Sequence, residues 1–344
     1  MSRAVRMNLP VFTCTVPLKP KRNAASDSST GGVGSPVSNN EGEEAMLLEN
    51  TPLSQAALKH FGLPRSPFVD DVQSREDVFQ SSGTRYARAA LMDAASNGGF
   101  IAVVGESGAG KTTLVEELEE RVRDEGKDIL IIRPYVLGME ASDRKGKTLK
   151  AAQIAEAIVA ALDPQARLRQ SPQARFRQMH DLLKASRRAG RRHLLVIDEA
   201  HCMPIPTLKH LKRFLELKDG LRRLIGIALV AQPELRALLV SQNPEVREVM
   251  QRCEIVALDP LDSELEAYLA HKFARFDLKP EQVFEKDAFD AMRQRLIHTP
   301  RGAKPGTGVS TCFPLAVHNL VCRAMNAAAS VGWPRVDAQC VLGA

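Results

Sequence analysis

A glycine-rich stretch containing a lysine and two threonines lies in the first third of the chain. It reads GESGAGKTT, residues Gly105 to Thr113, and lies between the apolar run FIAVV and the helix-like run LVEELEERV. The spacing fits the pattern GxxxxGK[ST], in which backbone amides of a curled loop point at phosphate oxygens and a helix N-terminus adds positive partial charge. The stretch therefore predicts a phosphate-binding loop between a strand and a helix.

The residue types in this loop suggest a part for each position. Gly105, Gly108 and Gly110 allow the backbone to curl. Lys111 is expected to reach the β- and γ-phosphates and Thr112 to coordinate Mg²⁺, so ATP and Mg²⁺ are the expected cofactors. A plain glycine turn before a helix would not need lysine and threonine there. The residues expected to surround the nucleotide are Gly105, Glu106, Ser107, Gly108, Ala109, Gly110, Lys111, Thr112 and Thr113.

A second stretch supplies the carboxylates that ATP hydrolysis needs. In HLLVIDEAH, four apolar residues precede Asp198 and Glu199, which therefore emerge at the carboxyl end of a buried strand. Ligands bind at that edge in open α/β sheets. Asp198 is expected to hold Mg²⁺ through water, and Glu199 to polarise the attacking water. The adjacent pair favours an ATPase over a small-molecule kinase. The alternative is that two acidic residues end a strand without a catalytic role.

Three later residues are candidates for contacts with the reacting phosphate. Gln232 ends the next apolar run and would lie at the same edge, close to the γ-phosphate or the water; equally, it is a turn residue before Pro233. Arg252 and, less strongly, Arg247 precede the last predicted strand. An arginine there could project into a neighbouring subunit's site and stabilise transition-state charge, or be an ordinary surface arginine.

Short apolar runs that alternate with amphipathic stretches must position these groups. This alternation indicates a parallel sheet covered by helices on both faces, hence an α/β fold with a P-loop core. The strands are expected at residues 100–105, 128–134, 193–200, 224–231 and 254–258, and helices at 84–96, 112–126, 148–162, 173–189 and 205–220. Helical sequence continues from there to the end, which predicts a small C-terminal lid domain.

Composition sets the domain organisation and excludes some classes of protein. Residues 1–50 are expected to form a flexible N-terminal arm, 51–260 the nucleotide-binding core and 261–344 the helical lid. No apolar run approaches the roughly 18 residues of a membrane helix, so we expect a cytoplasmic protein with no membrane partner. The 6 cysteines form no CxxC pair, which argues against a zinc site or a disulfide framework. A net charge of +6 is compatible with nucleic acid without deciding the matter.

The motifs and their order resemble those of the AAA+ ATPases. The similarity covers roughly Leu53 to Ala329 and extends to details: LKHFGLPRSPF, VIDEAH and AQPELRALL resemble the branch of transposition regulators such as the phage Mu B protein and TnsC, with ExeA-type secretion ATPases as near relatives. That resemblance implies oligomerisation on double-stranded DNA in a filament or ring, recruitment of a transposase, and ATP hydrolysis that drives disassembly.

The resemblance also implies a DNA-binding segment. In these relatives, basic residues after the second core strand track the DNA backbone; the matching segment here is MEASDRKGKTLK, with Arg144, Lys145, Lys147 and Lys150. Phosphate contacts of this kind give affinity without sequence preference. A solvated basic loop is the alternative. A second basic region, residues 167–193, ranks below it as a DNA-binding surface, a subunit contact or a solubilising face.

One departure from the family pattern affects the lid. Relatives often carry Pro-Arg at the start of the last lid helices, where this chain has Pro314 and Leu315, so lid sensing is absent or has moved, with Arg323 as a candidate. Two other functions stay open. One is an ExeA-like secretion-associated ATPase; the other is a scaffold that nucleotide stabilises without hydrolysis, against which the intact Lys111, Asp198 and Glu199 argue.

Overall fold

The computed structural model describes residues 50–69, 72–134, 149–240, 246, 248–249, 251–299 and 308–344. The predicted N-terminal arm lies outside the described residues, apart from residue 50. So do Arg144, Lys145, Lys147 and Arg247. Lys150 and Arg252 are described.

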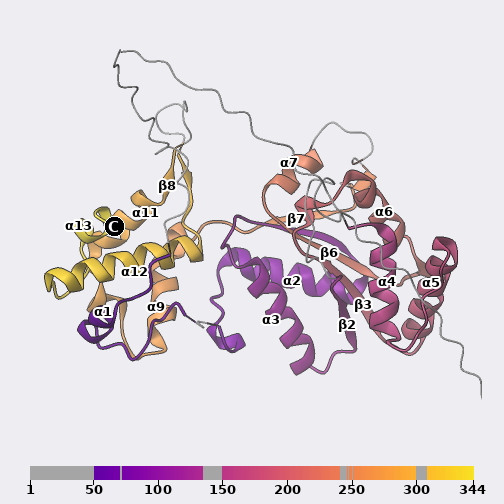
Figure 1. Ribbon diagram of the computed structural model, residues 1–344, viewed down its shortest axis with the longest axis horizontal. Helices are drawn as coiled ribbons and strands as arrows, with labels where there is room; N and C mark the ends of the chain where they lie inside the picture. Colours follow the sequence, from indigo (N-terminus) through magenta and orange to yellow (C-terminus); the bar gives the residue numbers. More distant parts are fainter. Residues whose placement is uncertain are drawn as a thin grey trace, which may run out of the picture. The chain divides into compact units, whose positions relative to one another are not determined.

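Five parallel strands form the central sheet (Figure 1). They are β1 (Phe100–Val104), β2 (Ile129–Ile132), β3 (Arg192–Ile197), β6 (Gly226–Ala231) and β7 (Glu254–Ala257), in the spatial order β2-β3-β6-β1-β7. The central strand pairs fix the register: Val103 lies opposite Val230 on one side and Val256 on the other. The α/β fold with a parallel sheet, predicted from the apolar runs, is confirmed.

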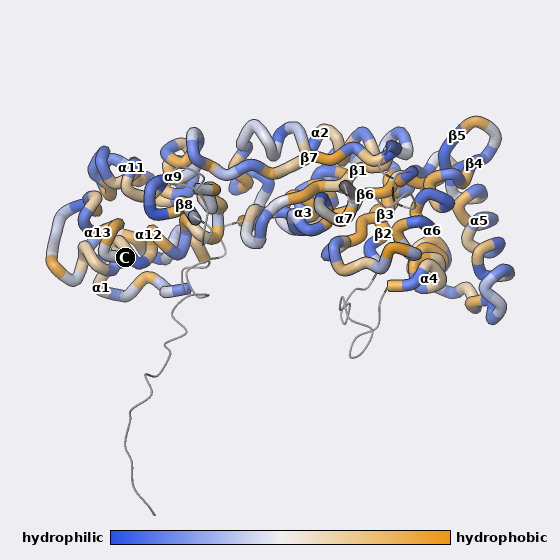
Figure 2. The backbone as a smooth tube through the Cα atoms, turned by 90° about the horizontal axis from the view of Figure 1, so that it is seen from above, coloured by the Kyte–Doolittle hydropathy of each residue, from blue (hydrophilic) through white to orange (hydrophobic). Residues whose placement is uncertain are grey.

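Helices cover both faces of this sheet because the strand side chains alternate between two apolar clusters. On one face, Phe100, Leu195 and Ile227 pack with α4 (Ala151–Leu162), α5 (Pro172–Arg188) and α6 (Ile205–Leu215). On the other, Ile101 and Leu194 pack with α2 (Ser82–Asn97) and α3 (Lys111–Asp124). Figure 2 shows the central strands and α4 coloured toward the hydrophobic end of the scale.

A third apolar cluster gathers the C-terminal helices. These are α9 (Leu265–Ala274), α10 (Pro280–Val283), α11 (Lys286–Arg295), α12 (Pro314–Val331) and α13 (Ala338–Leu342). The short helix α1 (Gln55–His60) joins them through Leu53, Ala57 and Phe61, and Asn326 bonds the backbone of the segment before α1. The division of the chain at residues 50 and 260 stays a prediction; α1 packs with helices that follow residue 260.

Two small hairpins were not expected from the sequence. The helix predicted over 205–220 ends at Leu215, and the chain then forms β4 (Lys218–Asp219) and β5 (Arg222–Arg223) around Gly220, which has φ 63°. A second hairpin pairs β8 (Ile297–His298) with β9 (Val309–Ser310). Strands of two residues are too short to show apolar alternation.

Within the described residues, none of the helices combines the length and the apolar character that a membrane span requires.

A buried ion pair holds α3, the helix that follows the phosphate-binding loop, against α2. Glu117 is only 3% exposed; its Oε2 lies 2.8 Å from Arg88 Nε, and its Oε1 lies 3.8 Å from Arg75 Nε. Replacing only one partner of such a pair would leave a buried charge without a counter-charge, which strongly lowers the stability of the fold. Replacing both partners with apolar residues would cost less. The pair therefore helps to hold α3 against α2.

Gly226 lies where the end of α2 closely approaches the sheet. A Cβ atom at this position would lie 2.2 Å from the backbone oxygen of Ala94 and 3.4 Å from Cα of Gly98. Because both neighbours are backbone atoms, no side-chain rotation can relieve the overlap. The glycine thus allows the end of α2 to pack directly on the first residue of β6.

We predict that Gly226→Ala lowers the free energy of unfolding by about 1–3 kcal/mol, the usual cost of overpacking a core. The matched control is Gly83→Ala in α2, where the new methyl group would meet only Asp259 N at 3.8 Å and Ala257 O at 3.9 Å. That control should keep or gain stability, by up to about 1 kcal/mol, because alanine favours helices. Urea unfolding of both variants measures the difference; equal stabilities would contradict the close packing.

Candidate active site

The phosphate-binding loop leaves β1 in a conformation that glycine makes possible. Gly105 N donates to the carbonyl of Ala231 at 3.1 Å, which joins the loop to the end of β6. Gly108 and Gly110 have φ of 75° and 86°, a left-handed region that other residues rarely occupy. Gly110 is the N-cap of α3, so the free amides of the first helical turn face the loop. This geometry is that of an anion-binding cradle.

Lys111 is held by the loop that precedes it. Its Nζ donates to the carbonyl oxygens of Gly105 and Glu106, each at 2.8 Å, and the residue is 9% exposed. Burial lowers the pKa of Lys111, while the negative charges of Glu199 and Asp198 oppose that shift. The loop and Glu199 line the same cleft, so the loop and the end of β3 belong to one site.

The end of β3 presents the two adjacent carboxylates. Asp198 is half-buried, and its Oδ1 accepts from the backbone N–H of Glu199 at 2.9 Å. Glu199 has φ 49° and ψ 37°, one of two non-glycine residues with positive φ among those described. Its side chain is 48% exposed. A left-handed glutamate is uncommon, and such strain clusters at functional positions.

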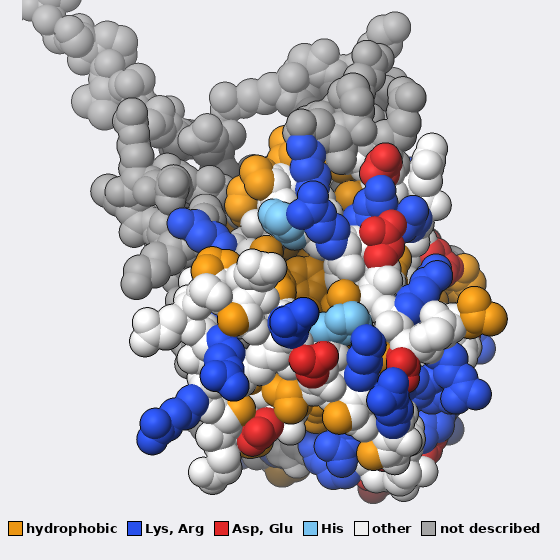
Figure 3. Space-filling model, turned by 90° about the vertical axis from the view of Figure 1, so that its right-hand side faces the viewer, with side chains coloured by type: hydrophobic (Ala, Val, Ile, Leu, Met, Phe, Trp, Pro, Cys, Tyr) orange, Lys and Arg blue, Asp and Glu red, His pale blue; other side chains and the backbone are white. Residues whose placement is uncertain are grey.

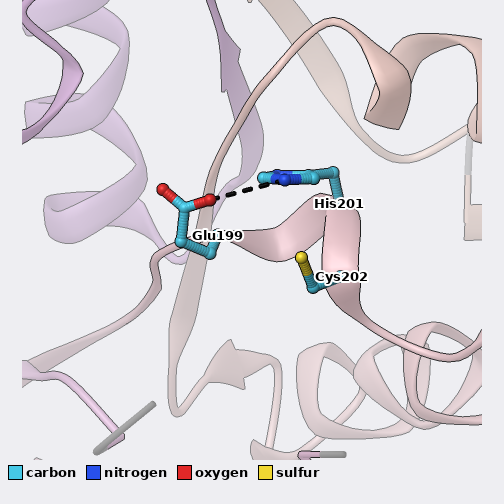
Figure 4. Close-up of side chains that lie close together, drawn as sticks. All are labelled: Glu199, His201 and Cys202. Atoms are coloured by element: carbon cyan, nitrogen blue, oxygen red, sulfur yellow. Dashed lines mark ion pairs between the residues drawn. The ribbon is translucent and has the colours of Figure 1, made fainter. Parts of the chain in front are cut away.

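Gln232 directly follows β6 and lines the same cleft as Glu199. Its backbone N–H donates to His201 Nδ1 at 3.4 Å, and His201 Nε2 lies 3.4 Å from Glu199 Oε2. Figure 4 shows the edge of the His201 imidazole directed at Glu199; Cys202 is the next residue of the same short turn. His201 was not among the residues predicted from the sequence; the available signal was its position two residues after Glu199.

Arg133 is a second residue that the sequence analysis missed. It follows β2, and its guanidinium lies 3.9 Å from Asp198 Oδ2 and 3.4 Å from Glu119 Oε1. The available signal was a basic residue at the end of the strand DILIIR, at the same edge as the carboxylates. A cation therefore stands beside the carboxylate that is predicted to hold a metal ion.

A cleft of about 410 Å³ lies beside the phosphate-binding loop. Its lining includes the loop from Ser107 to Thr113, Glu199 and Gln232, and at another part of its wall Phe79, Tyr268 and His318. The aromatic rings contact one another: Phe79 meets Tyr268 edge-on at 5.4 Å, and Tyr268 stacks on His318 at 5.8 Å. The volume lies within the range of small-ligand pockets.

The residues fit a magnesium nucleotide. The glycine cradle and helix N-terminus suit phosphates, the aromatic wall suits a purine base, and the Thr112 hydroxyl with the Asp198 carboxylate is an oxygen donor set of the kind that Mg²⁺ prefers. Lys111 supplies the charge that anionic oxygens need.

Leu315 lies against the loop, at the place where relatives often carry an arginine. Its backbone N–H donates to the Gly108 carbonyl at 3.2 Å, and a Cβ added to Gly108 would lie 2.3 Å from Leu315 Cβ. The first turn of α12 thus contacts the cradle through backbone and apolar atoms. Arg323, the suggested substitute for the missing arginine, is not among the residues that line the cleft.

The structure does not bring Arg252 into this site. It precedes β7, at the amino end of a strand whose carboxyl end faces the cleft, and its guanidinium bonds Glu216 Oε1 at 2.6 Å. Arg252 therefore lies on the opposite edge of the sheet from its own chain's phosphate loop. Lys150, the described member of the proposed DNA-binding set, is an exposed residue that caps the start of α4.

The second basic region forms an exposed face. Figure 3 shows lysine and arginine side chains spread over the face that carries α5. Part of this charge is already balanced: Arg175 pairs with Glu156, and Arg188 Nε bonds Asp219 at 2.8 Å. Arg177 on the same helix is exposed.

The fold and the site define a P-loop ATPase, and comparisons with known proteins refine that class. Residues 93–239 match the family described as AAA domain. General secretion pathway protein A of Aeromonas hydrophila is 25% identical over 246 residues, which cover 68% of this chain and 38% of that relative. The chain thus spans well under half of the relative's length.

Solved structures of low sequence identity also align with the chain. Cdc6p from Pyrobaculum aerophilum aligns with a TM-score of 0.45 and 16% identity, over 83% of this chain and 69% of that one. Domain III of the replication initiation protein DnaA from Thermotoga maritima gives 0.43 and 10%, over 85% and 96%. The AAA-domain match over residues 93–239, together with the parallel sheet and its loop, supports ATPase activity of the AAA+ type.

We predict that Gly108→Ala weakens ATP binding about tenfold or more. The new methyl group would strain a left-handed backbone, which costs about 1–3 kcal/mol, and would collide with Leu315. Gly62→Ala is the control, because Gly62 has φ 69° but no atom within 4 Å of the added Cβ. Titration calorimetry with ATP should show a changed Kd only for the loop variant; an unchanged Kd there would contradict the assignment of the cradle.

Proposed function

We propose that this AAA+ ATPase binds double-stranded DNA without sequence preference, oligomerises on it, and recruits and regulates a transposase, with ATP hydrolysis driving disassembly. The observation that carries the proposal is the meeting of Lys111, Glu199 and Gln232 at one cleft beside Asp198. Such a site supports hydrolysis as well as binding, which a switch requires. A cytoplasmic location accords with DNA and ATP as partners.

In this proposal each residue at the edge has a distinct part. Lys111 exchanges its loop carbonyls for phosphate oxygens, and Thr112 and Asp198 hold Mg²⁺. When bound, Mg²⁺ neutralises charge on the phosphate oxygens. Glu199 accepts a proton from the attacking water, and Gln232 orients that water or the γ-phosphate. Because Arg133 lies beside Asp198, it offsets the carboxylate's charge when no metal ion is held there.

The proposed DNA contacts involve Lys150 together with Arg144, Lys145 and Lys147. Lys150 follows Leu149, whose carbonyl accepts from the Thr207 hydroxyl at 2.8 Å in the first turn of α6. That helix begins a few residues after Glu199. A direct hydrogen bond therefore links the end of the basic segment to the chain that leaves the catalytic edge.

The proposed self-assembly gives Arg252 its part. It lies on the sheet edge opposite the chain's own phosphate loop, so it serves a neighbouring subunit's nucleotide when subunits stack head to tail. The Glu216 contact is exposed and weak enough to be exchanged for a phosphate.

An ExeA-like secretion-associated ATPase is the second candidate. The observation that favours it is the match to general secretion pathway protein A, over 68% of this chain. This function predicts the same ATPase site but no dependence of DNA affinity on nucleotide. DNA binding therefore separates the two candidates.

We predict that Glu199→Gln binds ATP normally but hydrolyses it about 10²- to 10⁴-fold more slowly, because the general base is lost. Complexes with double-stranded DNA should then persist after excess competitor DNA is added, as measured by fluorescence anisotropy. Release as fast as from the wild type would contradict the timer role. Failure of the wild type to bind DNA with ATP at low salt would favour the secretion-type function.

A pair of charge variants provides the control for that experiment. Alanine at Arg144, Lys145, Lys147 and Lys150 should reduce the slope of log Kd against log salt by about 3–4. An equal loss of charge at Arg167, Arg169, Arg177 and Arg188 should leave the slope unchanged. The opposite result would move the DNA surface to the second basic region.

A further inference from the structure

His201 bridges two parts of the active site that come from different strands. It lies in the short 3₁₀ turn Ala200–Cys202 that follows β3, and its side chain is 15% exposed. One ring nitrogen lies 3.4 Å from a Glu199 carboxylate oxygen, and the other accepts from the backbone N–H of Gln232 at 3.4 Å. Figure 4 shows the ring directed toward the glutamate.

The Gln232 contact determines where the ring carries its proton. A backbone N–H can only donate, so Nδ1 must offer its lone pair, and a neutral imidazole then has its hydrogen on Nε2. That hydrogen points to the Glu199 carboxylate, where it can donate a charge-assisted hydrogen bond. The contact on β6 therefore prepares His201 to hold the glutamate after β3.

The same tautomer argues against a metal site at this place. Ligand atoms of Glu199, His201 and Cys202 all lie within 4.8 Å of one another. A metal ion would need the lone pair of Nε2, but that nitrogen carries the hydrogen while Gln232 donates to Nδ1. Burial raises the pKa of the Cys202 thiol, and the charges of Glu199 and Glu234 raise it further, so the thiolate ligand is disfavoured too.

Glu199 depends on outside support for its orientation. Its backbone is fixed: φ is 49°, and its carbonyl accepts from Cys202 N at 2.9 Å. The side chain is half-exposed, and its carboxylate contacts His201 within the described part of the chain. The backbone thus fixes the position of the Glu199 Cα and Cβ atoms, and the imidazole fixes the position of the carboxylate.

We propose that His201 is a positioning residue that ties the Glu199 carboxylate to the end of β6 at Gln232. A displacement of Gln232 is then transmitted to Glu199 through the imidazole ring. The proposal rests on the proposed role of Glu199 as general base. His201 does not line the nucleotide cleft, whereas Glu199 and Gln232 do. Its loss should therefore affect turnover and leave nucleotide affinity unchanged.

Two conservative variants separate the two contacts. His201→Gln keeps an amide N–H near the position of Nε2, and so retains a donor for Glu199. His201→Asn keeps an oxygen near the position of Nδ1, and so retains an acceptor for Gln232 but loses the donor. We expect kcat to fall about 10- to 100-fold in His201→Asn, by misplacement of the base, and at most about threefold in His201→Gln. KM for ATP should stay within twofold in both.

The measurement is steady-state phosphate release by the full chain over a range of ATP concentrations up to saturation, with and without double-stranded DNA, which gives both kcat and KM. Cys202→Ser, on the same turn, is the control and should keep the wild-type kcat. Thermal unfolding of each variant reports whether it is folded. Equal kcat values for His201→Asn and wild type, or equal losses in the Asn and Gln variants, would overturn the proposal.

A double variant distinguishes this proposal from the proposed function itself. If His201 acts through Glu199, adding His201→Asn to Glu199→Gln should cause no further loss of kcat. A further tenfold loss in the double variant would overturn the positioning role. If Glu199→Gln hydrolyses ATP at the wild-type rate, the assignment of the general base is wrong. If Glu199→Gln is slow but His201→Asn hydrolyses ATP at the wild-type rate, the general base is correct and only the positioning role of His201 is wrong.

Discussion

The parallel pairing of β1, β3 and β6 is the constraint on which the rest of the structure depends. Because the three strands run in one direction, their carboxyl ends meet at one edge, where β1 delivers the phosphate loop, β3 the carboxylates and β6 Gln232. The hydrogen bond from Gly105 N to Ala231 O joins the loop to β6 beyond the last strand pair. Apolar packing on both faces holds the strands in this register, and the site follows from it.

Contacts from outside the sheet complete the edge. The first turn of α12 bonds the Gly108 carbonyl through Leu315, so the C-terminal helical cluster contacts the phosphate loop directly. The hydrogen bond from Thr207 to Leu149 connects α6 to the start of α4. These two hydrogen bonds connect the C-terminal helices to the phosphate loop and α6 to the start of α4.

Local sequence patterns were enough to predict the five strands, the loop from Gly105 to Thr113 and the strand end at Asp198 and Glu199. Each depends on neighbouring residues: apolar runs form buried strands, and glycines with Lys111 form the loop. Contacts between distant residues left no such signal. Arg133 with Asp198, Leu315 with Gly108 and His201 with Gln232 arise only from strand order and packing. The β4–β5 hairpin was missed because LELKDG continues the helical pattern before it.

Electron microscopy of the full chain with double-stranded DNA tests the central claim most directly, namely that the nucleotide at this edge controls assembly on DNA. The two samples contain a slowly hydrolysed ATP analogue or ADP at the same low salt concentration. The account predicts filaments or rings around DNA with the analogue and free DNA with ADP. Bare DNA in both samples, or equal coating in both, would contradict it.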